Sequence, residues 1–131
     1  MLEQLMGAGG MGSVYKAKDL RKVEARDRNP WVAVKLLNDD FKTHPGAFMS
    51  LQREARKSQT LAHPNIVQVF DFDREGDKVY MTMELLEGND LGHYIKNHPD
   101  GVEVEEALRL TREMGAALQH AHSHDITHAD F

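Results

Sequence analysis

Five short apolar segments, bounded by polar residues, lie within the first two thirds of the chain. Each either alternates apolar with polar residues or is almost continuously apolar, as half-buried and buried strands do. Leu2 and Leu5 are the expected core contacts of the first strand. The expected strands are Met1–Met6, Val14–Ala17, Trp31–Leu37, a segment that follows Pro64 and runs through Phe72, and Val79–Leu85.

Three further stretches carry apolar residues at helical spacing and predict helices. They run from about Pro45 to Leu61, from Leu91 to Lys96 and from Val104 to about His122. The charged segment Asp19–Pro30 contains the turn pair Asn29-Pro30 and is expected to be a loop. The residues expected on the buried faces of the two long helices are Phe48, Leu51, Ala55, Ser58 and Leu61, and Ala107, Thr111, Met114, Leu118 and Ala121.

Composition narrows the functional classes. The chain has 131 residues, a formal net charge of −5 and a pI near 5.9, so it lacks the basic surface that nucleic-acid binding requires. It has no cysteine, which excludes disulfides and thiolate chemistry and fits a reducing compartment. No apolar run is long enough to span a membrane, and the N-terminus is too short and too acidic for a signal peptide. We therefore expect a cytoplasmic protein region.

A glycine-rich turn is the first candidate for chemistry. Gly7, Gly9 and Gly12 follow the spacing G-x-G-x-x-G, which lets main-chain N–H groups approach an anion such as a triphosphate. Dinucleotide-binding folds share this spacing, but there the turn opens into a helix, whereas here an alternating strand pattern follows. An ordinary flexible hairpin is the remaining alternative.

Lys35 is the second candidate, because it interrupts the apolar strand Trp31–Leu37. A lysine in a buried strand needs an anionic partner, such as a phosphate or a carboxylate. The competing interpretation is an edge-strand lysine that discourages aggregation.

Together, the glycine turn with Val14 two residues beyond it, V-A-V-K at Val32–Lys35, and H-P-N-I-V at His63–Val67 resemble the protein kinase family. The G-A-G-G-M-G-S-V-Y sequence that begins at Gly7 resembles bacterial-type Ser/Thr kinases in particular. The resemblance implies an α+β fold: a kinase-like small lobe with a five-stranded antiparallel sheet and one helix, followed by the first helices of a truncated large lobe. It places the small lobe at residues 1–86 and the start of the helical lobe at residues 87–131.

The resemblance also assigns roles to particular residues. Lys35 would pair with Glu54 of the first long helix, and Asp130 would be the catalytic base of the H-R-D motif. Met83 would stand behind the adenine of ATP, whose edge would bond the backbone of Glu84 and Leu86, while Asp90 would lie near the ribose. The residues expected around the nucleotide are Gly7, Ala8, Gly9, Gly10, Gly12, Val14, Ala33, Lys35, Met83, Glu84, Leu86 and Asp90.

The same resemblance implies missing parts. Ala129 replaces the arginine of H-R-D, so we expect that activity in the full protein does not depend on the contact between that arginine and a phosphorylated activation loop. The metal-binding asparagine and the D-F-G motif would lie beyond Phe131, so we expect an ATP- and Mg²⁺-dependent kinase of protein substrates, present as a fragment that is inactive alone. A non-catalytic nucleotide-binding or interaction module is the alternative. Without the rest of that lobe, helix faces such as Leu110, Met114 and Leu118 would lack their partners, which would favour self-association, for example by a domain swap that exchanges the helical segment between chains.

Four histidines near the end of the chain raise the question of a metal site. His120 and His124 are spaced four apart, on one helix face, and His122 and His128 lie close in sequence. No carboxylate or other ligand stands at a recognised spacing, and the family commonly has histidines at the end of this helix. The sequence therefore favours a structural role over metal binding.

Overall fold

The computed structural model describes residues 1–9, 12–39 and 45–128. Five strands form one antiparallel sheet in the order β1-β2-β3-β5-β4. This confirms the five-stranded sheet expected from the sequence. The strands are β1 (Leu2–Gly9), β2 (Gly12–Lys18), β3 (Trp31–Leu37), β4 (Val69–Glu75) and β5 (Lys78–Met83).

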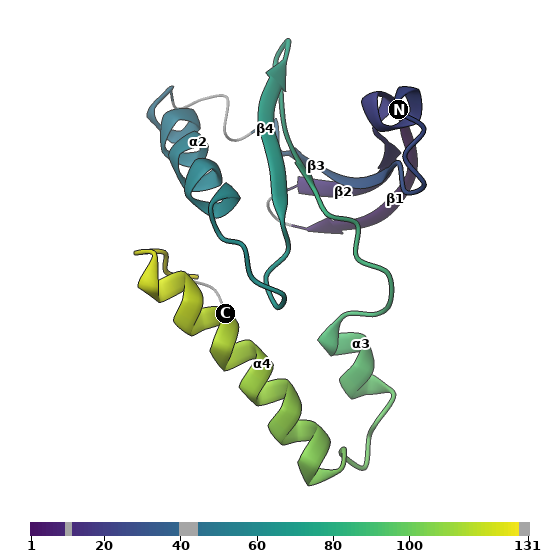
Figure 1. The fold of residues 1–131 in the computed structure, drawn as a ribbon, viewed down its shortest axis with the longest axis vertical. Coiled ribbons are helices and arrows are strands. Elements are labelled where there is room, and N and C mark those ends of the chain that lie inside the picture. The colour runs from purple at the N-terminus through teal and green to yellow at the C-terminus, as the bar shows by residue number, and fades with distance from the viewer. Residues whose placement is uncertain (10–11, 40–44, 129–131) are drawn as a thin grey trace.

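Four helices accompany this sheet in the described part of the chain. They are α1 (Leu20–Glu24), α2 (Pro45–Gln59), α3 (Leu91–Lys96) and α4 (Val104–Ser123). Figure 1 shows α2 beside β4, whereas α3 and α4 lie beyond the sheet, on the far side of the segment that joins α2 to β4. None of the helices among the described residues is long and apolar enough to cross a membrane.

The core is divided between the two faces of the sheet. On one face Ala17, Val32 and Val34 form a buried cluster against which Tyr80 packs. On the other face lies a second cluster, which includes residues of α2. Its members are Ala55, Phe72 and Val79, with Leu37, Phe48 and Met81 packed against them. Because β3 and β5 contribute to both clusters, they are the centre of the fold.

The expected core contacts of the first strand are wrong. Leu2 is 48% exposed and Leu5 is 53% exposed. β1 is an edge strand that pairs only with β2, and its register shifts twice, between Leu2 and Gln4 and between Leu5 and Gly7. Such irregularities disturb the alternation of side chains between the two faces, and no described element covers these two leucines.

The segment Asp19–Pro30 is not wholly a loop, because it begins with the short helix α1. Asp19 is its N-cap, and the carboxylate accepts a hydrogen bond from Arg21 N at 3.0 Å. An aspartate before Leu20 and Val23 was the available sequence signal. The charged residues in between obscured it.

Helix α4 buries less of itself than its apolar spacing predicts. Met114, Leu118 and Ala121 are half-buried, but Ala107 and Thr111 are exposed, so the expectation for those two residues is wrong. The reason is that α4 meets the rest of the chain mainly along its C-terminal half, against the segment between α2 and β4.

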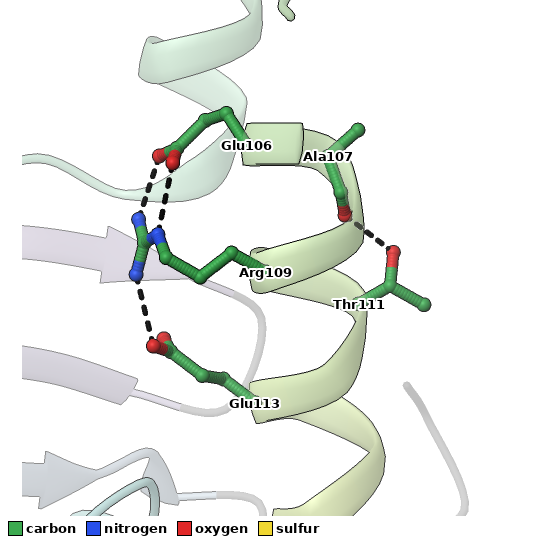
Figure 2. Close-up of polar contacts among 5 residues, drawn as sticks. All are labelled: Glu106, Ala107, Arg109, Thr111 and Glu113. Atoms are coloured by element: carbon green, nitrogen blue, oxygen red, sulfur yellow. Dashed lines mark hydrogen bonds and ion pairs between the residues drawn. The ribbon is translucent and has the colours of Figure 1, made fainter. Parts of the chain in front are cut away.

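The N-terminal half of α4 is supported by its own side chains. Figure 2 shows Arg109 between two glutamates: its guanidinium donates to both carboxylate oxygens of Glu106, at 2.6 and 2.8 Å, and to Glu113 at 2.9 Å. Thr111 Oγ1 donates to the Ala107 carbonyl oxygen at 2.7 Å. The bonds to Arg109 lower the pKa of Glu106 and raise that of Arg109.

Candidate functional site

The glycine-rich turn is a hairpin between β1 and β2, as the sequence predicts. Its last described pair is Gly9 opposite Gly12, and Gly10 lies outside the described residues. A Cβ atom built on Gly7 or on Gly9 meets no atom within 4 Å. Nothing in the described chain therefore requires glycine at these two positions, which leaves open space that a ligand could use.

Gly12 has a different reason to be glycine. Its φ is +153°, and a Cβ there would lie 1.9 Å from the Leu36 carbonyl oxygen. The backbone of β2 thus approaches β3 too closely for a side chain. Of the three glycines in the motif, Gly12 serves the fold itself.

The register of the sheet brings the predicted nucleotide residues onto one face. Val14, Lys35 and Met81 are consecutive partners across β2, β3 and β5, and Ala33, two residues before Lys35 in β3, faces Met83. Met81 packs against the cluster that includes residues of α2, so this row lies on the α2 face of the sheet. Val14, Lys35 and Met83 are half-buried, while Ala33 is buried.

The predicted partner of Lys35 lies on the helix beside this face. Glu54 is in α2, but its side chain is outside the part of the structure that is described. The Lys35–Glu54 pair therefore stays a prediction. Asp130 also lies outside the described residues.

The segment after β5 is fixed to the residue that precedes β4. Glu84 N donates to the Gln68 carbonyl oxygen at 2.9 Å, and Gln68 N donates to Glu84 Oε2 at 3.1 Å. Leu86, two residues on, is 60% exposed. The backbone at these two positions was expected to bond an adenine, and the N–H of Glu84 is already engaged within the chain.

Asp90 has a structural role that the sequence interpretation did not include. It is the N-cap of α3, and its Oδ1 accepts a hydrogen bond from His93 N at 2.6 Å. The structure thus gives a reason for an aspartate here that needs no ligand. Its proximity to a ribose stays a prediction.

A polar junction missed by the sequence analysis joins α4 to the segment between α2 and β4. Asn65 Nδ2 donates to the Glu113 carbonyl oxygen at 3.1 Å across 48 positions of sequence, and Asn65 N donates to His63 Nδ1 at 3.1 Å. The His63 and His120 rings lie 5.0 Å apart, and those of His120 and His124 lie 4.6 Å apart. The H-P-N-I-V motif at His63–Val67 contains two residues of this junction and was the sequence feature that could have indicated it.

His120 is the histidine of this junction that has an unsatisfied polar atom. Its Nε2 is buried and has no hydrogen-bond partner among the described residues. Burial lowers the pKa of His120, and repulsion from His124 and His63 lowers it further. The described residues contain no group of three or more His, Cys, Asp and Glu side chains that could hold a metal ion.

A cavity of about 650 Å³ opens beside this junction. The end of α2, the segment before β4 and the C-terminal half of α4 line it, mainly with apolar side chains. Leu61, Val69, Leu118, Ile126 and His128 are among the lining residues. The cavity is separate from the row of Val14 and Lys35.

Comparison with known proteins shows which family has this combination of sheet, glycine hairpin and helices. The protein kinase domain model matches residues 1–131, so the chain belongs to the protein kinase family.

Among curated relatives, the serine/threonine-protein kinase PrkC of Bacillus subtilis is 37% identical over 128 residues, which are 97% of this chain and 18% of that protein. PknE of Mycobacterium tuberculosis strain H37Rv is 34% identical over 129 residues, 98% of this chain and 22% of that protein. A crystal structure of a double mutant of the M. tuberculosis PknI kinase domain superposes with a TM-score of 0.83 at 26% identity, covering 99% of this chain and 49% of that one. The chain therefore spans about a fifth of these curated relatives and about half of the solved domain.

Proposed function

We propose that residues 1–86 bind ATP with Mg²⁺ and belong to a serine/threonine protein kinase that transfers a phosphoryl group to hydroxyls of protein substrates. The observation that carries this proposal is the shared sheet face of Val14, Ala33, Lys35 and Met83, with the glycine hairpin at its edge. Membership of the kinase family supports it. The need for ATP and the absence of cysteine support a cytoplasmic location for this region.

The residues fit a nucleotide in three respects. The open space above Gly7 and Gly9, together with neighbouring Ala8, lets main-chain N–H groups approach phosphates. Lys35 offers a cation on a rigid strand next to this hairpin, and Glu54 would orient it. Glu84 and Leu86 would present main-chain groups to the adenine, and Asp90 would lie near the ribose.

Residues 87–131 are proposed as the start of the helical lobe, in which Asp130 would accept the proton of the substrate hydroxyl. Magnesium supplies charge stabilisation in this chemistry, but we assign no metal ligand within these 131 residues. We therefore propose that a polypeptide limited to them binds ATP without turning it over.

A non-catalytic binding module is the second candidate. It is favoured by two predicted nucleotide groups that already have partners within the chain: the Glu84 N–H donates to the Gln68 carbonyl oxygen, and the Asp90 carboxylate caps α3. In that case the nucleotide, if bound, would organise a surface for a protein partner instead of being consumed.

Calorimetry of the 131-residue protein with ATP, with and without Mg²⁺, tests the proposal. We expect saturable binding that Lys35→Ala weakens about tenfold or more, because removing a charge-assisted contact to phosphate costs this much. Lys78→Ala is the matched control, because Lys78 is an exposed lysine of the same sheet. Absence of ATP binding, or equal loss in both variants, would contradict the proposed site.

A further inference from the structure

Strand β4 is one of the two outer strands of the sheet. Among the described strands it pairs only with β5, so its other side is an edge. The edge of a sheet presents main-chain N–H and C=O groups that a strand of another molecule can bond. The side chains of residues 70–75 are exposed except that of Phe72, and a stretch of this length is enough for strand pairing.

Two N–H groups of this edge are bonded by side chains of the same strand. Phe72 N donates to Asp71 Oδ1 at 2.8 Å, and Arg74 N donates to Asp73 Oδ1 at 2.7 Å. In an antiparallel pair, every second residue of a strand directs its N–H and C=O away from the partner strand. Phe72 and Arg74 are two residues apart, and side chains take their N–H groups, so these two residues form the outer edge of β4.

The beginning of β4 is closed in a different way. The register with β5 shifts between Val69 and Asp71, and the Phe70 carbonyl oxygen accepts a hydrogen bond from Gln59 Nε2 of α2 at 3.0 Å. Figure 1 shows α2 beside this strand. A register shift and a covering side chain both hinder the addition of a further strand. The rest of the edge depends on the two aspartates.

The choice of aspartate at positions 71 and 73 needs a reason, because aspartate is unfavourable in strands. Both side chains are exposed, and neither forms an ion pair with a described residue. Their bonds to the N–H groups of the next residues are therefore the contacts that account for them.

We propose that the outer edge of β4 is a strand-pairing surface for a second copy of this chain, and that Asp71 and Asp73 keep it closed by taking the N–H groups of Phe72 and Arg74. The partner strand is β4 of the second copy. Two copies of one edge pair antiparallel about a two-fold axis, so that each supplies the donors and acceptors that the other needs. This inference does not depend on the proposed ATP site.

Sedimentation of the 131-residue protein measures the pairing, with Leu108→Glu as the parent of every variant. Leu108 is 47% exposed on α4, and replacing it removes another route to association. Asp71→Ala combined with Asp73→Ala should raise the association constant about tenfold or more, because two N–H groups in each copy become available for bonds between copies. Exchange of the Phe72 and Arg74 amide hydrogens, followed by NMR, should slow as these pairs form.

Three variants separate the hydrogen bonds from charge and from stability. Asp71→Asn with Asp73→Asn retains both acceptors without their charge and should keep the edge closed. Val79→Ala weakens the buried cluster beside α2 without opening the edge, so it should not raise association. Arg74→Pro, added to the double alanine variant, removes an outward N–H at a position where a strand edge tolerates proline, and should reverse the gain. Trp31 fluorescence, from the only tryptophan, reports whether each variant is folded.

Each outcome decides the proposal. Stronger association of the double alanine variant, reversed by Arg74→Pro and absent from the double asparagine variant, supports it. An association constant equal to that of the parent overturns it. An equal rise in the double asparagine variant would attribute the closure to charge, and an equal rise in Val79→Ala would attribute association to lost stability; either result overturns it. A gain that persists with Arg74→Pro also overturns it, because the copies would then pair elsewhere.

Discussion

The imidazole rings of His63 and His120 lie 5.0 Å apart and join two segments that are distant in sequence. His63 Nδ1 accepts a hydrogen bond from Asn65 N at 3.1 Å, so this nitrogen carries no proton. His120 Nε2 is buried and has no described partner. The junction between α4 and the segment before β4 therefore disfavours a proton on His120.

Stability should consequently fall in mild acid. Burial lowers the pKa of His120 in the folded protein below its ordinary value of 6.5, and the nearby His124 and His63 add to this effect. The unfolded chain thus binds a proton more readily, so stability declines as the pH falls below about 6.5 and levels off below the folded-state pKa. Thermal unfolding followed by circular dichroism between pH 7.5 and 5.5 measures the decline.

Two variants locate the origin of that decline. His120→Phe keeps an aromatic ring without a titrating group and should reduce the pH dependence. His122→Gln removes an exposed histidine of the same helix and should not. An equal slope in the wild type and His120→Phe would show that His120 does not cause it.

Asn65 provides the second test of the junction. Asn65→Asp removes the donor to the Glu113 carbonyl oxygen and puts a charged acceptor in its place. We expect a loss of about 1–2 kcal/mol in the free energy of unfolding, measured in urea. Asn89→Asp makes the same charge change at an exposed residue between β5 and α3 and should have little effect; equal losses would contradict the role of Asn65.

The sequence predicted those parts of the structure whose signals are local. Apolar continuity identified β3 with its bounds, and helical spacing identified α2, α3 and α4 to within a few residues. The glycine spacing and the V-A-V-K motif predicted residues that share one sheet face. That these residues lie on one face, however, depends on the register of the strands. The register pairs residues about twenty or more positions apart, such as Val14 with Lys35.

What sequence could not predict depends on long-range contacts. Leu2 and Leu5 are apolar but exposed, because nothing described covers the edge strand. Two bonds leave no periodic pattern in the sequence. They are the bond from Gln68 N to the Glu84 carboxylate and the bond from the Asn65 side chain to the Glu113 carbonyl oxygen. The two glycine functions within one motif were likewise indistinguishable before the backbone was known.

These glycine functions can be separated by substitution. Gly12→Ala should destabilise the fold by about 3 kcal/mol or more, since its Cβ would collide with main-chain atoms of β3 that cannot simply move aside. Gly7→Ala and Gly9→Ala should change stability by less than about 1 kcal/mol in either direction, while weakening ATP binding. Urea unfolding and calorimetry on the three variants measure both quantities. Equal destabilisation at all three positions would contradict this division.

Self-association is the last expectation. Leu110, Met114 and Leu118, on which it was based, are half-buried, so the expectation for these three residues is wrong. Other apolar side chains are exposed along α3 and α4. Ile95 is 59% exposed, Val104 is 72% exposed and Leu108 is 47% exposed. An exposed apolar surface of this kind favours association, so the sedimentation coefficient of the 131-residue protein should rise with concentration into the tens of micromolar. Leu108→Glu should suppress that rise, whereas Leu20→Glu on α1 should not, although Leu20 is also exposed. A monodisperse monomer at these concentrations, without binding of a hydrophobic dye, would exclude self-association.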